Sequence, residues 1–204
     1  MSKTVTGLFD HYDDALTASN HLESLGVPRA SISVVANNSD DWYGRDDRRP
    51  DTADTADDAA TGVGVGAVLG GAGGLLAGLG LLAIPGIGPV VAAGWLASTA
   101  AGAVAGAVAG GAAGGLIGSL TSAGVSENDA NVYAEGVRRG GTLVSAKVDE
   151  ALADEAQAIL EKHKSVDVGE RERLYRGNGW SRFDEAAPPY SADEVARERR
   201  QYLV

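Results

Sequence analysis

Residues 4–37 have the sequence TVTGLFDHYDDALTASNHLESLGVPRASISVVAN, and its pattern predicts a strand, a helix and a second strand. Thr4 to Phe9 is rich in β-branched and aromatic residues, and Ser31 to Ala36 is a second apolar run of strand length. Between them, Tyr12 to Leu25 repeats apolar residues at helical spacing, and Gly26 ends the helix. One face of this helix is expected to contain Ala15, Ala18, Leu22 and Leu25.

A second unit of the same kind is expected between residues 125 and 170. Ser126 begins a short helix, and Thr142 to Val148 then alternates as a strand. A helix from Glu150 to His163 follows, and Val166 to Val168 forms a last short strand. The predicted N-caps of the three helices are Asp10, Ser126 and Asp149.

Each βαβ unit alone is too small to cover its own sheet face. The two are therefore expected to combine into a four-stranded antiparallel sheet with two helices on one face, a ferredoxin-like α+β sandwich. The predicted boundaries are 1–37 for the first half, 38–60 for an acidic flexible linker, 61–124 for an inserted helical hairpin, 125–170 for the second half, and 171–204 for a polar tail. The tail contains spaced aromatic residues that favour docking on another surface, and Ser191 is expected to cap a final helix.

The segment between Asp58 and Glu127 contains no charged side chain and holds most of the 29 glycines of the chain. Small residues recur in it at every fourth position, in two runs separated by the sequence Ile-Pro-Gly-Ile-Gly-Pro. This spacing predicts a glycine zipper, two helices that pack through Gly62, Gly66, Gly70, Gly74, Gly78, Gly94, Ser98, Gly102, Gly106, Gly110, Gly114 and Gly118. The turn of this hairpin is assigned to Pro85, Gly86, Gly88 and Pro89.

The glycine pattern also predicts partners. Glycine in a helix costs about 1 kcal/mol relative to alanine, so such helices need close contacts that compensate. Because four residues overshoot one helical turn by about 40°, a single partner helix cannot cover the whole stripe. The remaining surface is expected to contact other copies of the protein, giving a homo-oligomer, or a lipid bilayer. The first arm has about the length of a bilayer core, but the second is too long for one untilted span and weakly apolar, so both partners stay open.

Composition argues against several other classes of function. The chain of 204 residues has a formal net charge of -11 and no cysteine, which disfavours nucleic acid as a partner and excludes disulfides and thiolate sites. No phosphate-binding loop, dinucleotide fingerprint or nucleophile elbow occurs, and His11, His21 and His163 are not spaced as metal ligands. We therefore predict no catalytic residue, no cofactor and no metal site, and hence a chain that is not an enzyme. The first residues lack a secretory signal, which predicts a cytoplasmic protein that can associate with the inner face of the cell membrane.

Two stretches resemble the bacterial general-stress, heat-induced stress protein family, whose biochemical activity is unknown. They are TGLFD at residues 6–10 with the helix that follows, and YAEGVRRGGTLV at residues 133–144. Many members are similar in carrying a glycine-rich hairpin whose corner reads Ile-Pro-Gly-Ile-Gly-Pro, as at residues 84–89. The resemblance covers residues 4–168 and implies an association with the stress response, but it supplies no catalytic residues.

Two functions from different classes remain as hypotheses. The first is a non-enzymatic stress-response protein that assembles with itself, or associates with membrane, through the glycine-zipper hairpin. The alternative is a soluble oligomeric module that senses or binds a ligand on a ferredoxin-like domain. The sequence leaves open the copy number, the stress signal, the role of the tail, and whether Arg138 and Arg139 contact lipid phosphates or carboxylates such as Glu135.

Overall fold

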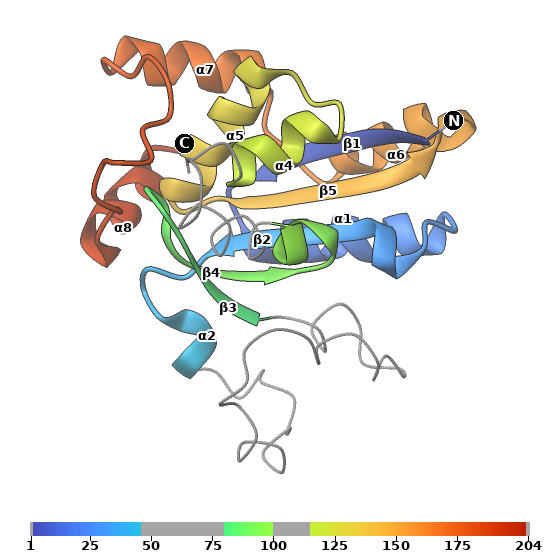
Figure 1. The fold of residues 1–204 in the computed structure, drawn as a ribbon, viewed down its shortest axis with the longest axis horizontal. Coiled ribbons are helices and arrows are strands. Elements are labelled where there is room, and N and C mark those ends of the chain that lie inside the picture. The colour runs from blue at the N-terminus through green and yellow to red at the C-terminus, as the bar shows by residue number, and fades with distance from the viewer. Residues whose placement is uncertain (1, 46–79, 100–114, 203–204) are drawn as a thin grey trace, which may run out of the picture.

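The computed structural model describes residues 2–45, 80–99 and 115–202, which form a mixed α/β fold on one antiparallel sheet (Figure 1). Its strands are β1 (Ser2–Phe9), β2 (Ile32–Asn37), β3 (Gly80–Ile84), β4 (Gly88–Ala93) and β5 (Thr142–Asp149). They lie side by side in the order β1-β5-β2-β4-β3, and each neighbouring pair is antiparallel. β5 therefore joins the first and second strands of the chain, in register Val34 with Val144 and Val5 with Ala146.

The N-terminal strand, helix and strand are present as the sequence predicts. Helix α1 (Tyr12–Ser24) lies between β1 and β2, followed by the short 3-10 helix η1 (Arg29–Ser31). The predicted N-cap at Asp10 is wrong: His11 occupies that position and makes no side-chain capping bond. Both carboxylate oxygens of Asp10 instead accept hydrogen bonds of 2.8 Å from Arg171, a residue far away in the sequence.

The second unit is only partly as predicted. Helix α5 (Glu127–Arg138) begins at Ser126, whose hydroxyl accepts a 3.1 Å hydrogen bond from the Asp129 N–H. After β5 come the 3-10 helix η4 (Glu150–Leu152) and helix α6 (Ala153–Lys162), and Asp149 makes no side-chain capping bond.

The predicted strand at residues 166–168 does not form. The Val166 N–H makes one 2.7 Å hydrogen bond to the Leu8 carbonyl of β1, and helix α7 (Val168–Gly177) starts immediately afterwards. Asp167 caps α7 by accepting from the Glu170 N–H at 2.7 Å. A local capping signal therefore replaces the extended backbone that a further strand beside β1 would need.

The sheet has helices on both faces, not on one face as predicted. Alternate residues of each strand point to opposite sides, so Val34 and Val144 contact α1 and α6, whereas Val35 and Leu143 contact helices α4 (Leu116–Ser122) and α5. We call these the α1/α6 face and the α4/α5 face. Both hold buried apolar clusters, and the fold is therefore a three-layer arrangement.

Outside this core, residues 42–45 and α7 form helices that the sequence does not predict, whereas the final helix expected after Ser191 is confirmed. In the predicted linker, residues 42–45 form the short helix α2 (Trp42–Arg45), and the Trp42 indole N–H donates to the Asn37 carbonyl at 2.8 Å. In the tail, α7 is followed by helix α8 (Ala192–Gln201), which begins with a capping box between Ser191 and Glu194. Figure 1 shows α7 and α8 at the end of the sheet opposite the N-terminus.

Candidate functional site

The centre of the predicted helical hairpin is a β-hairpin. β3 and β4 pair from Gly80 with Ala92 to Ile84 with Gly88, and β4 also pairs with β2. The helical interpretation of residues 80–93 is therefore wrong. The reason is a contact distant in the sequence: one edge of β2 is not paired with β5, and β4 hydrogen-bonds to that edge. Val90 and Val91 are β-branched and fully buried there, which favours a strand.

The predicted turn residues lie in the turn of this β-hairpin. The Ile87 N–H donates to the Ile84 carbonyl at 3.0 Å, and Gly86 has a φ of 74°. Proline at the second position and glycine with positive φ at the third is the arrangement of a type II turn, which Pro85 and Gly86 supply. A Cβ on Gly86 would lie 2.8 Å from the Asp184 carbonyl oxygen, so glycine also permits close approach of the tail.

Few of the predicted zipper residues lie in the described structure. Gly94 is not in a helix: it has a φ of 81° and packs against the Ile32 carbonyl, where any Cβ would collide. Ser98 lies in a helical segment at residues 95–99 and donates to the Trp95 carbonyl at 2.9 Å. Gly118 lies in α4. The remaining predicted contacts, Gly62, Gly66, Gly70, Gly74, Gly78, Gly102, Gly106, Gly110 and Gly114, fall outside the described residues.

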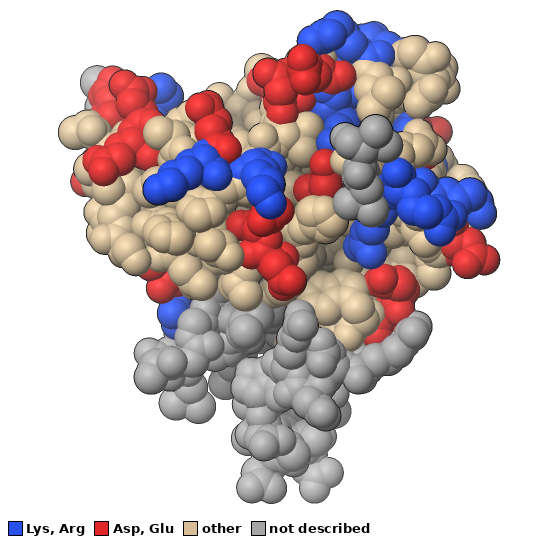
Figure 2. All heavy atoms as spheres, turned by 180° about the vertical axis from the view of Figure 1, so that it is seen from behind, with Lys and Arg blue, Asp and Glu red and all other residues tan. Residues whose placement is uncertain are grey.

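β3 forms one edge of the described sheet and carries no charged side chain. Leu81, the second residue of β3, is 55 % exposed, one of two exposed large apolar residues in the described part of the chain. The face of the molecule shown in Figure 2 differs from the uncharged strand β3, because acidic and basic side chains lie next to one another on it. Within residues 2–45, 80–99 and 115–202, no helix combines the length and apolarity needed to cross a membrane.

The end of α5 carries a buried ion-pair cluster. Arg139 donates from Nε to Glu135 at 2.6 Å and from a terminal nitrogen to Glu198 of α8 at 3.1 Å. Glu135 is 1 % exposed and Arg139 7 %. Burial opposes the charged form of Arg139, but the hydrogen bond and charge of Glu135 outweigh it and raise the pKa of this guanidinium. Arg139 therefore stays charged and joins α5 to α8.

A second ion pair joins α7 to Asp10, the residue after β1. Arg171 forms a two-pronged contact with Asp10, and its guanidinium lies 3.8 Å from the centre of the Tyr202 ring. Burial opposes the charge of Arg171, yet hydrogen bonds to Asp10 raise its pKa. Burial also raises the pKa of Tyr202, whose hydroxyl donates to Glu198 at 2.7 Å. The residues Glu135, Arg139, Arg171, Glu198 and Tyr202 are here called the tail-docking cluster.

Neighbouring contacts of α5 also hold the tail. Arg138 donates to the Pro188 carbonyl at 3.1 Å and lies 4.8 Å from the centre of the Tyr190 ring. Gly140 has a φ of 105°, and a Cβ there would lie 2.5 Å from a methyl carbon of Val195 in α8. The Arg199 guanidinium donates to the Gly140 carbonyl at 2.9 Å. The tail is therefore docked, and Arg138 and Arg139 contact carboxylates and carbonyls of their own chain.

The sequence predicts that the tail docks, and it leaves Glu135 open as a contact of Arg138 or Arg139, but it does not indicate Asp10 or Glu198 as partners. Arg171 pairs with Asp10, and Arg139 pairs with Glu198 as well as with Glu135. The contacts to Asp10 and Glu198 join segments that are too distant in the sequence for any spacing rule. One signal was available, since glutamate and arginine at positions 135 and 139 have the four-residue spacing of a helical ion pair.

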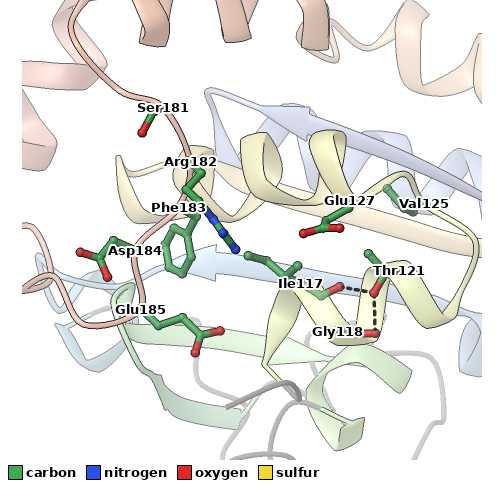
Figure 3. A pocket seen from close by; sticks show the side chains of 10 residues that line it. All are labelled: Ile117, Gly118, Thr121, Val125, Glu127, Ser181, Arg182, Phe183, Asp184 and Glu185. Carbon is green, nitrogen blue, oxygen red and sulfur yellow. Dashed lines mark hydrogen bonds between the residues drawn. The ribbon is translucent and has the colours of Figure 1, made fainter. Parts of the chain in front are cut away.

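A cavity of about 930 Å³ opens between α4 and the tail loop at residues 181–185 (Figure 3). Ile117, Val125 and Phe183 supply apolar surface, and Arg182 reaches toward Ile117. The Thr121 hydroxyl already donates to two carbonyls of α4, at 3.0 and 3.1 Å. Glu127, Asp184 and Glu185 also line it, so carboxylates outnumber the single guanidinium.

Comparison of the chain with protein-family models, with curated proteins and with solved structures finds no match.

Proposed function

We propose that this chain is a non-enzymatic stress-response protein that assembles with itself through its uncharged central segment, either alone or on a lipid bilayer. The observation that carries the proposal is the absence of any charged side chain between Asp58 and Glu127, in a chain whose net charge is -11. The described part of this segment includes the edge strand β3, where Leu81 is exposed.

An apolar edge strand favours self-association. Proteins that stay monomeric usually block such edges with charged residues, proline or a covering element. β3 has the sequence Gly-Leu-Leu-Ala-Ile, which contains neither a charged residue nor a proline. The glycines spaced by four on either side of the β-hairpin support a zipper contact between helices of different copies.

The α/β domain serves as the head of this assembly. We propose that β1, α1, β2, β5 and α6 form a variant of the ferredoxin-like sandwich, because both helices lie on one face and β5 lies between β1 and β2. In this variant one hydrogen bond from Val166 takes the place of the fourth strand, and the tail docks on α5. The assignment to the stress response rests on the resemblance at residues 6–10 and 133–144.

The experiment is to measure the particle mass of the untagged protein by light scattering, with and without mild detergent. Gly106→Leu and Leu81→Lys should each reduce the mass while the circular dichroism spectrum is retained, because a bulky or charged side chain cannot enter such contacts. Leu174→Lys is the matched control, since Leu174 is also exposed, at 43 %, but lies on α7. Equal effects of Leu81→Lys and Leu174→Lys would remove the role proposed for β3.

A second candidate function is a ligand-binding module, and the cavity beside α4 favours it. It combines apolar side chains with one guanidinium and three carboxylates, groups that can contact a small polar organic ligand. A thermal-shift screen against metabolites, with Phe183→Ala as the site variant, tests this candidate. A ligand that stabilises the wild type but not the variant supports it, and stabilisation by no compound argues against it.

A further inference from the structure

Two of the three histidines, which the sequence separates widely, lie against each other in the structure. His21 of α1 and His163, directly after α6, stack with ring centres 4.5 Å apart and ring planes 19° from parallel. The two helices lie on the same face of the sheet. The pair therefore bridges α1 and α6 at the surface.

The hydrogen bond of His21 fixes which ring nitrogen carries its proton. Nδ1 lies 3.0 Å from the Thr17 carbonyl oxygen, and a carbonyl can only accept. Nδ1 therefore carries the hydrogen, and in the neutral tautomer Nε2 is the nitrogen with the lone pair. A backbone carbonyl that holds the other ring nitrogen is how proteins orient histidines that bind metals.

The charges around the pair keep His163 available as a neutral ligand. Partial burial, the neighbouring His21 and Lys162 lower the pKa of His163, and Asp14 on α1 acts in the opposite direction. Asp14 also lies 3.5 Å from the exposed Lys164 ammonium group. The lowered pKa of His163 favours its unprotonated imidazole, which is the form that coordinates a metal ion.

We propose that His21 and His163 form a two-imidazole site for a transition-metal ion of the Zn²⁺, Cu²⁺ or Ni²⁺ class. Imidazole nitrogens suit these ions, with bonds of about 2.0–2.1 Å to zinc. The hydrogen bond to Thr17 holds the His21 ring, and rotation of the His163 ring about its broad terminal torsion can turn one of its nitrogens toward an ion bound at His21 Nε2. No cluster of three or more histidine and carboxylate ligands occurs in the described residues, so water completes the coordination.

This site has a structural consequence. The ion would link α1 to α6 only when the protein is folded, so binding stabilises the native state. The proposal is independent of self-assembly, because neither histidine belongs to the uncharged segment.

The experiment uses the full chain without a histidine tag and titrates it with zinc chloride, in parallel by calorimetry and thermal unfolding. Wild type and His11→Asn, the matched control, should bind zinc and melt at a higher temperature. His21→Asn and His163→Asn should each weaken binding by about tenfold or more, because loss of a ligand costs at least as much as loss of its supporting partner. Acidification that protonates the imidazoles should also abolish binding.

Electron paramagnetic resonance of the copper-loaded protein provides a second readout. Two equivalent nitrogens on Cu²⁺ in wild type and one in either variant support the site. Absence of zinc-dependent stabilisation in the wild type, or equal zinc binding by His21→Asn, would overturn the proposal. His21 is exposed, so its replacement leaves the folded core unaffected.

Discussion

The two faces of the sheet are held together by different forces. On the α1/α6 face the interior is apolar, and a polar contact between elements such as Lys164 with Asp14 is peripheral, with 78 % of the lysine side chain exposed. On the α4/α5 face the apolar cluster continues into ion pairs around Glu135, whose side chain is 1 % exposed. Apolar contacts can be replaced by others of similar volume, whereas a buried charge that loses its partner has no substitute.

This difference assigns separate roles to the two faces. The α1/α6 face stabilises the fold through apolar packing, so the free energy of unfolding should change gradually with the volume of the side chains there. The α4/α5 face specifies one position of the tail, because only a docked tail brings Glu198 to Arg139 and Arg171 to Asp10. We therefore expect substitutions on the two faces to differ in kind as well as in size.

The largest effect is expected at Glu135. Glu135→Gln keeps the shape of the side chain but leaves the buried Arg139 without its closest carboxylate, which should lower the free energy of unfolding by about 3–5 kcal/mol. Urea unfolding measures this change. Glu155→Gln, on the exposed side of α6, is the control and should change stability by less than about 0.5 kcal/mol.

The same site offers a test of coupling. Glu135→Met combined with Arg139→Met should cost clearly less than the sum of the two single variants, because apolar residues can replace a complete buried pair. Additive costs would show that the pair is not the source of the effect.

The next effect is on the α1/α6 face. Leu160→Ala should lower the free energy of unfolding by about 2–5 kcal/mol, since the fully buried leucine leaves a cavity between α6 and β1. Leu160→Met keeps the volume and should cost less than about 1.5 kcal/mol. Urea unfolding of both compares them with Glu135→Gln. If Leu160→Met were as harmful as Glu135→Gln, the distinction between the faces would fail.

A smaller effect is expected at Gly136, where α5 crosses the sheet closely. A Cβ there would collide with the Leu8 side chain, and one Leu8 methyl would lie only 2.9 Å away. Overpacking costs about 1–3 kcal/mol and alanine returns about 1 kcal/mol in helix propensity, so Gly136→Ala should destabilise by up to about 2 kcal/mol. Gly177→Ala in α7 meets open space and should be neutral or slightly stabilising by thermal unfolding.

The smallest effect concerns pH. The pKa of His163 is lowered from 6.5 in the folded protein, chiefly by partial burial, so the unfolded chain binds its proton more readily. Stability should therefore not depend on this group above about pH 7, and should decline as the pH falls through the ordinary histidine range. His163→Asn should remove this part of the pH dependence in metal-free urea unfolding between about pH 5 and 8. A stability that rises on acidification through this residue would contradict the sign.

The local elements of the fold could be predicted where the spacing of apolar residues in the sequence matches the buried side of the strand or helix. β1, α1 and β2 are such a case, as are the helices capped at Ser126 and Ser191, because these signals act over a few residues. The β-hairpin could not be predicted from the glycine spacing, although the Pro85-Gly86 turn between two apolar runs was a usable signal.

The tail-docking cluster and the histidine pair lie beyond sequence reasoning for a different reason. Arg171 meets Asp10, and His163 meets His21, only after the chain has folded. The second face of helices was missed because the helix after Ser126 was placed in the second half of the domain without a position on the sheet, whereas the buried side of α5 packs on it.

The central claim is that the uncharged segment makes the protein assemble. Its most direct test is the mass of the untagged full chain by sedimentation, in buffer, in mild detergent and with lipid vesicles. Assembly through this segment should give a soluble particle of several 20.7 kDa chains, or recovery with vesicles and release by detergent. A single 20.7 kDa chain in buffer that neither associates nor binds vesicles would contradict it.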